Sequence, residues 1–419
     1  MITYPDSVRF LYSLGNELKA VKFGLDTIRA VLRELGHPER AVRAVHVAGT
    51  NGKGSTCAMI ASGLREAGFS TGLFTSPHLV EPVERIQIDG VPVTAEEFSR
   101  AFDIVHQAAE KLLAAGSLET HPTYFETVTA MAFILFRERD VDRVVLEVGL
   151  GGRLDATNVV TPELCVITPI DYDHESWLGA TIDLIAAEKA GIIKPQIPVV
   201  IARQREDAEQ VLLRRAAELG APVIPAPEAE RFEAGPRGSI VHWRGMALQC
   251  PLAGVHQVGN TITAAEALRA LDVADNAILR GIARTRWPGR LEAVSTSPDI
   301  ILDGAHNPAG ARALAGYITR FYNHRKVWLI YGTMRDKSVA EIADTLFPLA
   351  QELILTAADS ARSLAPESLL PLTAHPRATI APNLAAALEL ARAGASPDDA
   401  IFISGSLFLV GEARALLVR

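Results

Sequence analysis

The sequence predicts an α/β protein with two domains, each built on a mainly parallel β-sheet. From residue 43 onward, short segments rich in β-branched residues alternate with longer segments rich in Ala and Leu, which is typical of parallel strands joined by helices. The chain has 419 residues, more than one ordinary hydrophobic core accommodates. Two domains are therefore expected, and the 31 glycines can supply the turns between strands and helices.

The first part of the chain has four predicted strands, at residues 44–48, 143–148, 164–168 and 199–202, with helices such as 55–67 and 208–219 between them. An apolar run at residues 128–136 is about half of a membrane span, so we expect a buried helix there. Residues 223–252 contain Pro, Gly and short alternating pieces, and they predict a small β excursion with a strand at 239–243. A helix at 261–271 follows it.

An interdomain hinge is predicted at residues 286–290, where Pro288 and Gly289 interrupt a helical pattern. We place the boundary there, which gives domains at residues 1–286 and 287–419. The alternation restarts after the hinge, with strands at 300–302, 327–331, 353–356 and 401–403 and helices at 309–322, 339–347 and from 407. This pattern predicts a smaller, Rossmann-like second domain.

Charge and cysteine content exclude several partners and settings. A net charge of −8 gives no basic surface for a nucleic-acid backbone, so we expect no nucleic-acid partner. The cysteines, Cys57, Cys165 and Cys250, match no metal-ligand spacing and no disulfide framework, which favours a reducing cytoplasm. Residues 1–15 lack the apolar stretch of a signal peptide, and we expect no membrane partner.

The most specific motif is Gly49-Thr50-Asn51-Gly52-Lys53-Gly54-Ser55, which lies between a predicted strand and a predicted helix. Glycines allow backbone N–H groups to turn toward phosphate oxygens, and the helix N-terminus adds a positive dipole. Lys53 can neutralise phosphate charge, and Ser55 can offer its hydroxyl to Mg²⁺. The motif predicts an ATP site and a first domain like that of phosphate-loop ATPases.

The spacing of this loop departs from the usual pattern, which has four residues between the first Gly and Gly-Lys. Here two residues intervene, and Gly54 separates Lys53 from Ser55. The alternative is a tight glycine turn without a ligand, but Lys53 and Ser55 both stand where a triphosphate needs them.

The variant loop resembles that of the Mur ligase superfamily, and within it the folylpolyglutamate and dihydrofolate synthases. Further segments resemble blocks of that family, in the same order along nearly the whole chain, at residues 75–79, 84–86, 123–126, 147–158, 173–174, 188–192 and 303–308. The resemblance implies an ATP- and Mg²⁺-dependent ligase that adds glutamate to a folate or to its pteroate precursor.

Two magnesium ions are implied. Glu147 ends an apolar strand, and open α/β sheets bind ligands at the carboxyl ends of their strands. A carboxylate together with Ser55 and ATP oxygens suits the oxygen coordination of Mg²⁺. The resemblance adds Ser76 and His174 as magnesium contacts, although imidazole is an unusual ligand for so hard a cation. The alternative for Glu147 is a solvated strand-end carboxylate.

Lys189 is implied to carry a carbamate. An unmodified ammonium beside two Mg²⁺ ions would be repelled, but a lysine whose pKa is lowered by nearby cations can be neutral and react with CO₂. The resulting anion would hold or support a metal ion. The alternative is an ammonium paired with Glu188 or another acid on an exposed helix face.

The resemblance also implies nucleotide contacts from Asn260 in the first domain and from Arg290 and Asp303 in the second. A cation at the hinge can stabilise phosphate charge only when the domains close, so Arg290 would couple closure to chemistry, the alternative being a surface arginine. His306 is implied to lie near the incoming glutamate. Three further sites follow strand ends and are expected to line the glutamate pocket: Ser404, Ser406 and residues 332–337.

On the pterin side, the sequence resembles bacterial enzymes that make dihydrofolate from dihydropteroate and also extend the polyglutamate tail. The residues implied to bind or cover the pterin are Gly24, Leu25, Asp26, Thr123, Tyr124, Phe125, Glu126, Leu154, Asp155 and Ala156. The residues implied to act in the chemistry are Lys53, Lys189, His174 and His306. We expect both activities, in a monomer that acts on small molecules.

The expected reaction phosphorylates the substrate carboxylate with ATP and then replaces the phosphate by the amine of glutamate. One alternative is another Mur-type ligase acting on a different carboxylate, such as that of a uridine-nucleotide sugar. Those enzymes usually carry a further N-terminal domain, for which a phosphate loop at residue 49 would leave no room. The other alternative, an ATPase without ligase activity, does not account for the block at 303–308.

Overall fold

The computed structural model describes residues 2–15, 24–335, 339–373 and 375–418, and the chain forms two compact units. The first unit comprises Met1–Glu228 and Gly259–Arg284, and the second comprises Ala229–Val258 and Thr285–Arg419. The last crossing between the units, after Arg284, lies close to the boundary placed after residue 286. The segment Ala229–Val258 lies in the second unit, whereas the sequence-based boundary placed it in the first domain.

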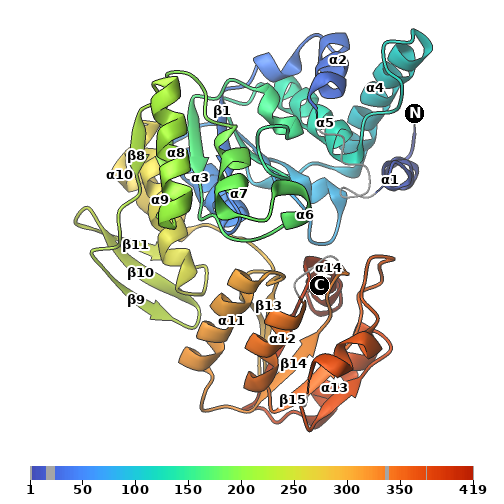
Figure 1. Ribbon diagram of the computed structural model, residues 1–419, viewed down its shortest axis with the longest axis vertical. Coiled ribbons are helices and arrows are strands. Elements are labelled where there is room, and N and C mark those ends of the chain that lie inside the picture. The colour runs from blue at the N-terminus through green and yellow to red at the C-terminus, as the bar shows by residue number, and fades with distance from the viewer. Residues whose placement is uncertain (1, 16–23, 336–338, 374, 419) are drawn as a thin grey trace. The chain divides into compact units, whose positions relative to one another are not determined.

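The first unit is built on an eight-stranded sheet in the order β4-β3-β2-β5-β1-β6-β7-β8. Figure 1 labels β1 and β8 of this sheet. The strands are β1 (Ala44–Ala48), β2 (Thr71–Phe74), β3 (Ile86–Ile88), β4 (Val91–Pro92), β5 (Arg143–Glu147), β6 (Leu164–Ile167), β7 (Val199–Ile201) and β8 (Val223–Pro225). β3 and β4 pair antiparallel at one edge, and the other six run parallel. The central strands are buried along their whole length, which is typical of parallel strands covered on both faces.

Helices cover this sheet. They are α1 (Tyr4–Ser13), α2 (Asp26–Glu34), α3 (Lys53–Glu66), α4 (Ala95–Ala114), α5 (Tyr124–Glu138), α6 (Glu175–Leu178), α7 (Ile182–Ala190), α8 (Glu206–Leu219), α9 (His256–Ala270, which starts in the second unit) and α10 (Asp275–Ala283). Helices α1, α2, α4 and α5 form one hydrophobic cluster with β2 and β5, and α7 and α8 form another with β6 and β7. The buried helix expected at residues 128–136 is α5, so that prediction is confirmed.

The four strands predicted in the first unit are confirmed, and each ends within one residue of β1, β5, β6 or β7. Strand β2 was not predicted, because Gly72 weakens the strand pattern. A Cβ on Gly72 would lie 2.6 Å from the ring of Phe136, so the glycine is what allows α5 to pack on this strand.

The β excursion predicted at residues 223–252 is a three-stranded antiparallel sheet of β9 (Arg231–Gly235), β10 (Gly238–Trp243) and β11 (Met246–Cys250), but its first residues form β8 of the large sheet instead. Its place in the second unit follows from contacts with later residues. Arg237 forms an ion pair with Asp299 at 3.0 Å, and the Tyr317 hydroxyl donates to Pro236 O at 2.8 Å. These partners are 62 and 81 residues away along the chain, so no local pattern announces them.

The second unit also contains a six-stranded sheet, in the order β12-β13-β17-β14-β15-β16. Its strands are β12 (Glu292–Thr296), β13 (Asp299–Asp303), β14 (Val327–Tyr331), β15 (Glu352–Leu355), β16 (Ala378–Ile380) and β17 (Ala400–Ser404), and its helices are α11 (Pro308–Phe321), α12 (Val339–Leu346), α13 (Leu384–Gly394) and α14 (Leu407–Leu417). All strands run parallel except β12. The predicted α/β class with two parallel-rich sheets is confirmed.

Two glycines set the distance between helices in the first unit. A Cβ on Gly281 of α10 would lie 2.3 Å from Gly63 Cα of α3, and a Cβ on Gly63 would lie 2.3 Å from Leu268 Cδ1 of α9. The backbones of α3 and α10 therefore meet without side chains between them.

Gly281→Ala is expected to lower the free energy of unfolding by about 1–3 kcal/mol, because the added methyl meets backbone that cannot turn aside. Gly259→Ala is the matched control in the same unit. It is also helical, a Cβ there meets nothing within 4 Å, and it should raise stability by about 0.5–1 kcal/mol. Denaturant unfolding followed by circular dichroism measures both, and equal effects would contradict the packing described.

Candidate functional site

The strand order of the first unit brings four loops to one edge of its sheet. β2, β5, β1 and β6 are parallel neighbours, so their carboxyl ends lie side by side. The residues at or just after these ends include Ser76, Glu147, the loop from Gly49, and the segment that ends at His174. The structure thus brings the predicted phosphate and metal residues to the edge at which open α/β sheets bind ligands.

The phosphate loop joins β1 to α3 as predicted, although α3 begins at Lys53 rather than at Ser55. Gly52 caps the helix with a φ of +84°, and a Cβ there would lie 2.3 Å from Asn260 Oδ1. A Cβ on Gly49 would lie 1.9 Å from Thr168 Oγ1. Both positions therefore require glycine, and Asn260 lies directly against the loop.

The N–H groups of Thr50 and Asn51 are already used within the protein. Both donate to Pro169 O, at 3.0 and 3.2 Å. Of the N–H groups expected to face phosphate, those of Thr50 and Asn51 are thus engaged within the protein. The expectation now applies to the N–H groups in the first turn of α3, which starts at Lys53. Its N-cap has no side chain, so the positive end of this helix is suited to an anion.

Lys189 of α7 is buried against the phosphate loop. Its Nζ donates to Gly49 O at 2.8 Å, and Lys53 donates to another carbonyl of the same loop at 3.2 Å. Burial, and then the charge of Lys53, lowers the pKa of Lys189 to about 7. The exposed alternative is wrong, because Lys189 is 4% exposed and Glu188 binds Arg153 at 2.9 Å.

Glu147 is a buried acid rather than a solvated strand end, so that alternative is also wrong. Its Oε2 accepts a hydrogen bond from Ser76 N at 3.0 Å, which joins the loops after β5 and β2. Ser55 is buried as well. His174 adopts a left-handed φ of 54°, and its N–H donates to Asp173 Oδ1 at 2.9 Å. The edge thus carries a carboxylate and a hydroxyl, which are donors of the kind that Mg²⁺ prefers.

Asp155 organises the loop after β5. Its buried carboxylate accepts hydrogen bonds of 2.9–3.0 Å from the N–H groups of Gly149, Leu150 and Thr157, while burial raises its pKa. A Cβ on Gly152 would lie 2.8 Å from Glu188 O, so this loop packs directly on α7 next to Lys189. Ala156, also buried, begins a 3-10 helix, η3 (Ala156–Val159). The predicted pterin contacts of Leu154, Asp155 and Ala156 stay predictions.

Thr123 and Glu126 cap α5 reciprocally. Glu126 Oε2 accepts from Thr123 N at 2.8 Å, and Thr123 Oγ1 accepts from Glu126 N at 3.2 Å. Phe125 packs on the loop after β5, because a Cβ on Gly149 would lie 2.6 Å from its Cζ. Thr123 and Glu126 thus stabilise the start of α5, and Phe125 packs against the loop after β5. Contact of these residues with a substrate stays a prediction.

Sequence reasoning missed a hydrogen-bonded network at the loop that carries Ser76. Arg85 Nε donates to His78 Nδ1 at 2.9 Å, and His78 Nε2 lies 3.2 Å from the hydroxyl of Tyr12. Burial, and then Arg85, lowers the pKa of His78 to about 3, so its ring is neutral. Arg85 also lies over the ring of Tyr124. The family-like blocks at 75–79 and 84–86 were the available signal, but a sequence block names no partner.

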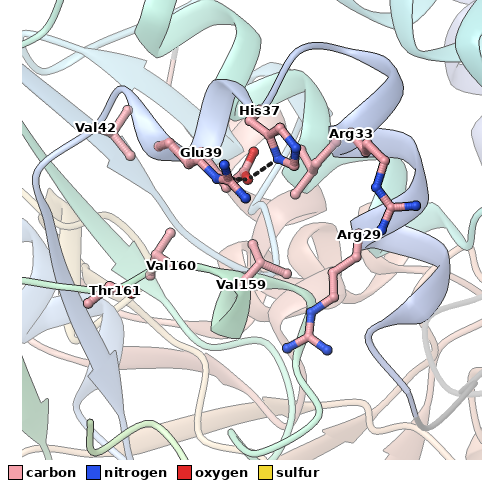
Figure 2. A pocket seen from close by; sticks show the side chains of 10 residues that line it. Arg29, Arg33, His37, Glu39, Val42, Val159, Val160 and Thr161 are labelled. Atoms are coloured by element: carbon pink, nitrogen blue, oxygen red, sulfur yellow. Dashed lines mark hydrogen bonds and ion pairs between the residues drawn. The ribbon is translucent and has the colours of Figure 1, made fainter. Parts of the chain in front are cut away.

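A pocket of about 450 Å³ lies beside α2 (Figure 2). Arg29 and Arg33 reach it from α2, and His37 and Glu39, joined by a 2.9 Å hydrogen bond, come from the turn that follows. Residues 159–161 line it as well. Its first lining residue, Arg29, follows Gly24, Leu25 and Asp26 closely in the sequence. None of the predicted pterin residues lines the pocket.

In the second unit, four predicted residues gather at the carboxyl ends of β13 and β17. These strands are parallel neighbours in which Asp303 pairs with Ser404. His306 Nδ1 is hydrogen-bonded to Gly304 O at 2.8 Å, and Ser406 Oγ caps α14 by accepting from Leu409 N. Residues 336 and 337, the end of the predicted 332–337 segment, lie outside the described residues.

Asp303 and Arg290 are linked through the backbone around them. The buried Asp303 carboxylate accepts from Leu291 N at 3.0 Å and from Ala305 N at 3.1 Å, and burial raises its pKa. A Cβ on Gly304 would lie 2.3 Å from Arg290 Nη1. Arg290 is therefore packed against this edge of the sheet rather than extended into solvent, which disfavours the surface alternative.

Comparison with known families matches both parts of the chain. Residues 47–268 match the Mur ligase middle domain, and residues 289–407 match the Mur ligase glutamate ligase domain. Among curated proteins, the chain is 37% identical to the dihydrofolate synthase/folylpolyglutamate synthase of Bacillus subtilis, covering 99% of both sequences. It is 34% identical to the enzyme of that name from Escherichia coli, covering 95% of this chain and 92% of the relative.

Solved structures agree over the same length. Folylpolyglutamate synthase of Mycobacterium tuberculosis in complex with ADP superposes with a TM-score of 0.93 at 33% identity, covering 99% of this chain and 98% of that one. The E. coli FolC protein in complex with DHPP and ADP gives a TM-score of 0.88 at 31% identity, covering 99% of each chain. Within the described ranges, no helix has both the length and the apolar composition that a membrane span needs.

The buried amine of Lys189 predicts a specific pH dependence of stability. The unfolded chain keeps this proton up to its ordinary pKa of 10.5, while the folded chain loses it near 7. Between these values the unfolded state binds more protons, so stability rises with pH. Lys189→Met should remove up to about 1.4 kcal/mol per pH unit from that rise.

Denaturant unfolding between pH 7.5 and 9.5, without CO₂, nucleotide or Mg²⁺, measures the two slopes. Lys111→Met is the control, because the Lys111 side chain is 71% exposed and its removal should leave the slope unchanged. A slope in Lys189→Met equal to that of the wild type would contradict the burial of this amine.

Proposed function

The chain belongs to the Mur ligase family, within the folylpolyglutamate and dihydrofolate synthases, and from this we propose that it is an ATP-dependent ligase that adds L-glutamate to tetrahydrofolate and to dihydropteroate. The arrangement of the phosphate loop, Glu147 and Lys189 at one sheet edge carries the proposal. The full-length match to relatives named for both activities supports it.

A free carboxylate is a poor electrophile, so amide formation in water needs activation. The substrate carboxylate attacks the γ-phosphorus of ATP, which forms an acyl phosphate and releases ADP. The amine of glutamate then attacks the acyl carbon, and phosphate leaves with the bonding electrons. The protein contributes mainly positioning and electrostatic stabilisation in such phosphoryl transfers.

We assign the nucleotide to the helix end at the phosphate loop. Lys53 and the first-turn N–H groups of α3 are suited to the phosphate charge, and Asn260 lies against the loop at Gly52. Arg290 and Asp303 are proposed to add nucleotide contacts from the second unit, where Arg290 would stabilise the transferring phosphate. His306, Ser404 and Ser406 are proposed to receive glutamate at the edge of β13 and β17.

Two Mg²⁺ ions are proposed at Ser55, Ser76, Glu147 and His174. The donors fit a hard cation in kind, since the buried Glu147 supplies a carboxylate at the strand end and Ser55 supplies a hydroxyl at the start of α3. When bound, magnesium neutralises developing charge on the phosphoryl oxygens. The hydrogen bond from Ser76 N to Glu147 joins the two loops that carry these residues.

We propose that Lys189 is carbamylated. A pKa near 7 leaves a large neutral fraction at physiological pH, and only the neutral amine attacks CO₂, with loss of a proton. Burial is the largest cause of the lowered pKa of Lys189, and the expected effect of a nearby cation, here Lys53, comes second. The carbamate would replace a buried positive charge by a negative one next to the proposed metal ions.

Lys189→Ala is expected to lower ligase activity by roughly 10- to 100-fold, the usual effect of removing a group that supports a metal ligand. A short carboxylate such as acetate, added in excess, should restore part of the activity, whereas Lys189→Arg should stay inactive with or without it. Steady-state assays at saturating Mg²⁺ measure this. Full activity of Lys189→Arg would disprove the carbamate.

The remaining assignments rest on the same family. Gly24, Leu25 and Asp26, together with residues 123–126 and 154–156, are proposed to surround the pterin of the substrate. We further propose that the protein acts as a monomer in the cytoplasm, on folate or dihydropteroate, glutamate and ATP, without nucleic-acid or membrane partners.

The purified protein with ATP, Mg²⁺ and glutamate should release ADP only when dihydropteroate or tetrahydrofolate is also present. Mass spectrometry should then find a product that is heavier by one glutamate residue. A uridine-nucleotide sugar substrate should support neither event. ADP release that needs no glutamate and yields no amide would rule out a ligase.

A further inference from the structure

Three side chains outside the set of residues assigned above have the composition of a transition-metal site. His106 and Glu110 lie four residues apart on α4, and so on one face of that helix, while His121 lies in the segment before α5. One potential ligand atom from each lies within 4.8 Å of the others. We propose that His106, Glu110 and His121 bind one divalent transition-metal ion of the zinc type.

The donor set matches zinc rather than magnesium. Two imidazole nitrogens and one carboxylate oxygen, with a water in the fourth position, form a common tetrahedral zinc site with metal–ligand distances of about 2.0–2.2 Å. His121 Nε2 already lies 2.7 Å from Glu110 Oε1. The Glu110 side chain is 55% exposed, so it is able to rotate toward an ion and leaves a position open for water.

Packing around the two rings restricts them to this region. The rings of His106 and His121 lie within 13° of parallel with centroids 5.4 Å apart. Phe10 of α1 packs edge-on against both, at 4.7 and 5.3 Å. Both imidazoles are thereby held beside Glu110, with one potential ligand atom of each residue within 4.8 Å of the others.

One ring nitrogen of His106 lacks a hydrogen-bond partner among the described residues. Its Nδ1 is buried and makes no hydrogen bond to any residue in the described ranges. A buried polar atom without a partner costs free energy, and such an atom often belongs to a site whose ligand is missing. Glu110 and His121 satisfy each other, so the third member of the cluster is the one that lacks a partner.

A metal ion here would stabilise the fold. It would join α4 to the segment that leads into the capped start of α5, and Phe10 would connect the site to α1. Zinc should therefore protect the protein against unfolding.

The test titrates the full-length protein with Zn²⁺ in excess Mg²⁺, by calorimetry, and repeats it with Co²⁺, whose visible absorption reports tetrahedral coordination. The wild type should bind one equivalent, and a 100-fold excess over the dissociation constant should raise the unfolding temperature by on the order of 5 °C. Glu110→Gln, His106→Ala and His121→Asn should each weaken this binding at least tenfold.

Glu96→Gln, on the exposed part of the same helix, and His324→Ala, at an exposed position in the second unit, are the matched controls and should bind as the wild type does. Glu147→Gln alters the proposed magnesium site only, so this variant should still bind one equivalent of Zn²⁺. Glu110→Gln changes only the charge of an exposed side chain, so circular dichroism should show an intact fold. The absence of a bound equivalent in the wild type, or unchanged affinity in a folded Glu110→Gln, would overturn the proposal.

Discussion

The burial of the Lys189 amine against the phosphate loop, where Nζ donates to Gly49 O, determines much of the chemistry available at the first unit's sheet edge. Placing an amine in a buried position disfavours its charged form, and the nearby Lys53 disfavours it further. The loop after β5 keeps water away from one side, because Gly152 packs directly on the backbone of α7. A lysine that would carry a full charge in solvent is thereby made available in its neutral form.

The same edge depends on the absence of side chains at a few positions. Gly49 and Gly52 lie so close to Thr168 and Asn260 that any Cβ would collide with them. Their positions fix the phosphate loop between strand and helix, and the bonds from Thr50 and Asn51 to Pro169 hold it further. A loop fixed in this way needs little ordering when a ligand arrives, which reduces the entropic cost of binding.

Local sequence patterns predicted those parts of the fold that depend on local chemistry. The buried strands β1, β5, β6 and β7 carry continuous apolar residues, and the phosphate loop combines a strand, glycines and a helix start within a short segment. Long-range partners were not predictable in that way. Neither the His78–Arg85–Tyr12 network nor the use of Thr50 N–H by Pro169 leaves a periodic signal, because each depends on residues that meet only after folding. The phosphate and metal residues named by resemblance lie at one sheet edge of the first unit, and Asp303, His306, Ser404 and Ser406 lie at one sheet edge of the second. Gly24, Leu25 and Asp26 lie instead at the start of α2, and all ligand contacts stay predictions.

The segment Ala229–Val258 has a consequence for the order of synthesis. The chain leaves the first unit after Glu228, returns at Gly259, and leaves again after Arg284. A ribosome therefore releases β9, β10 and β11 before it makes Asp299 and Tyr317, the residues to which this small sheet is anchored. The nascent sheet must wait for its partners while α9 and α10 complete the first unit, so the two units cannot mature strictly one after the other.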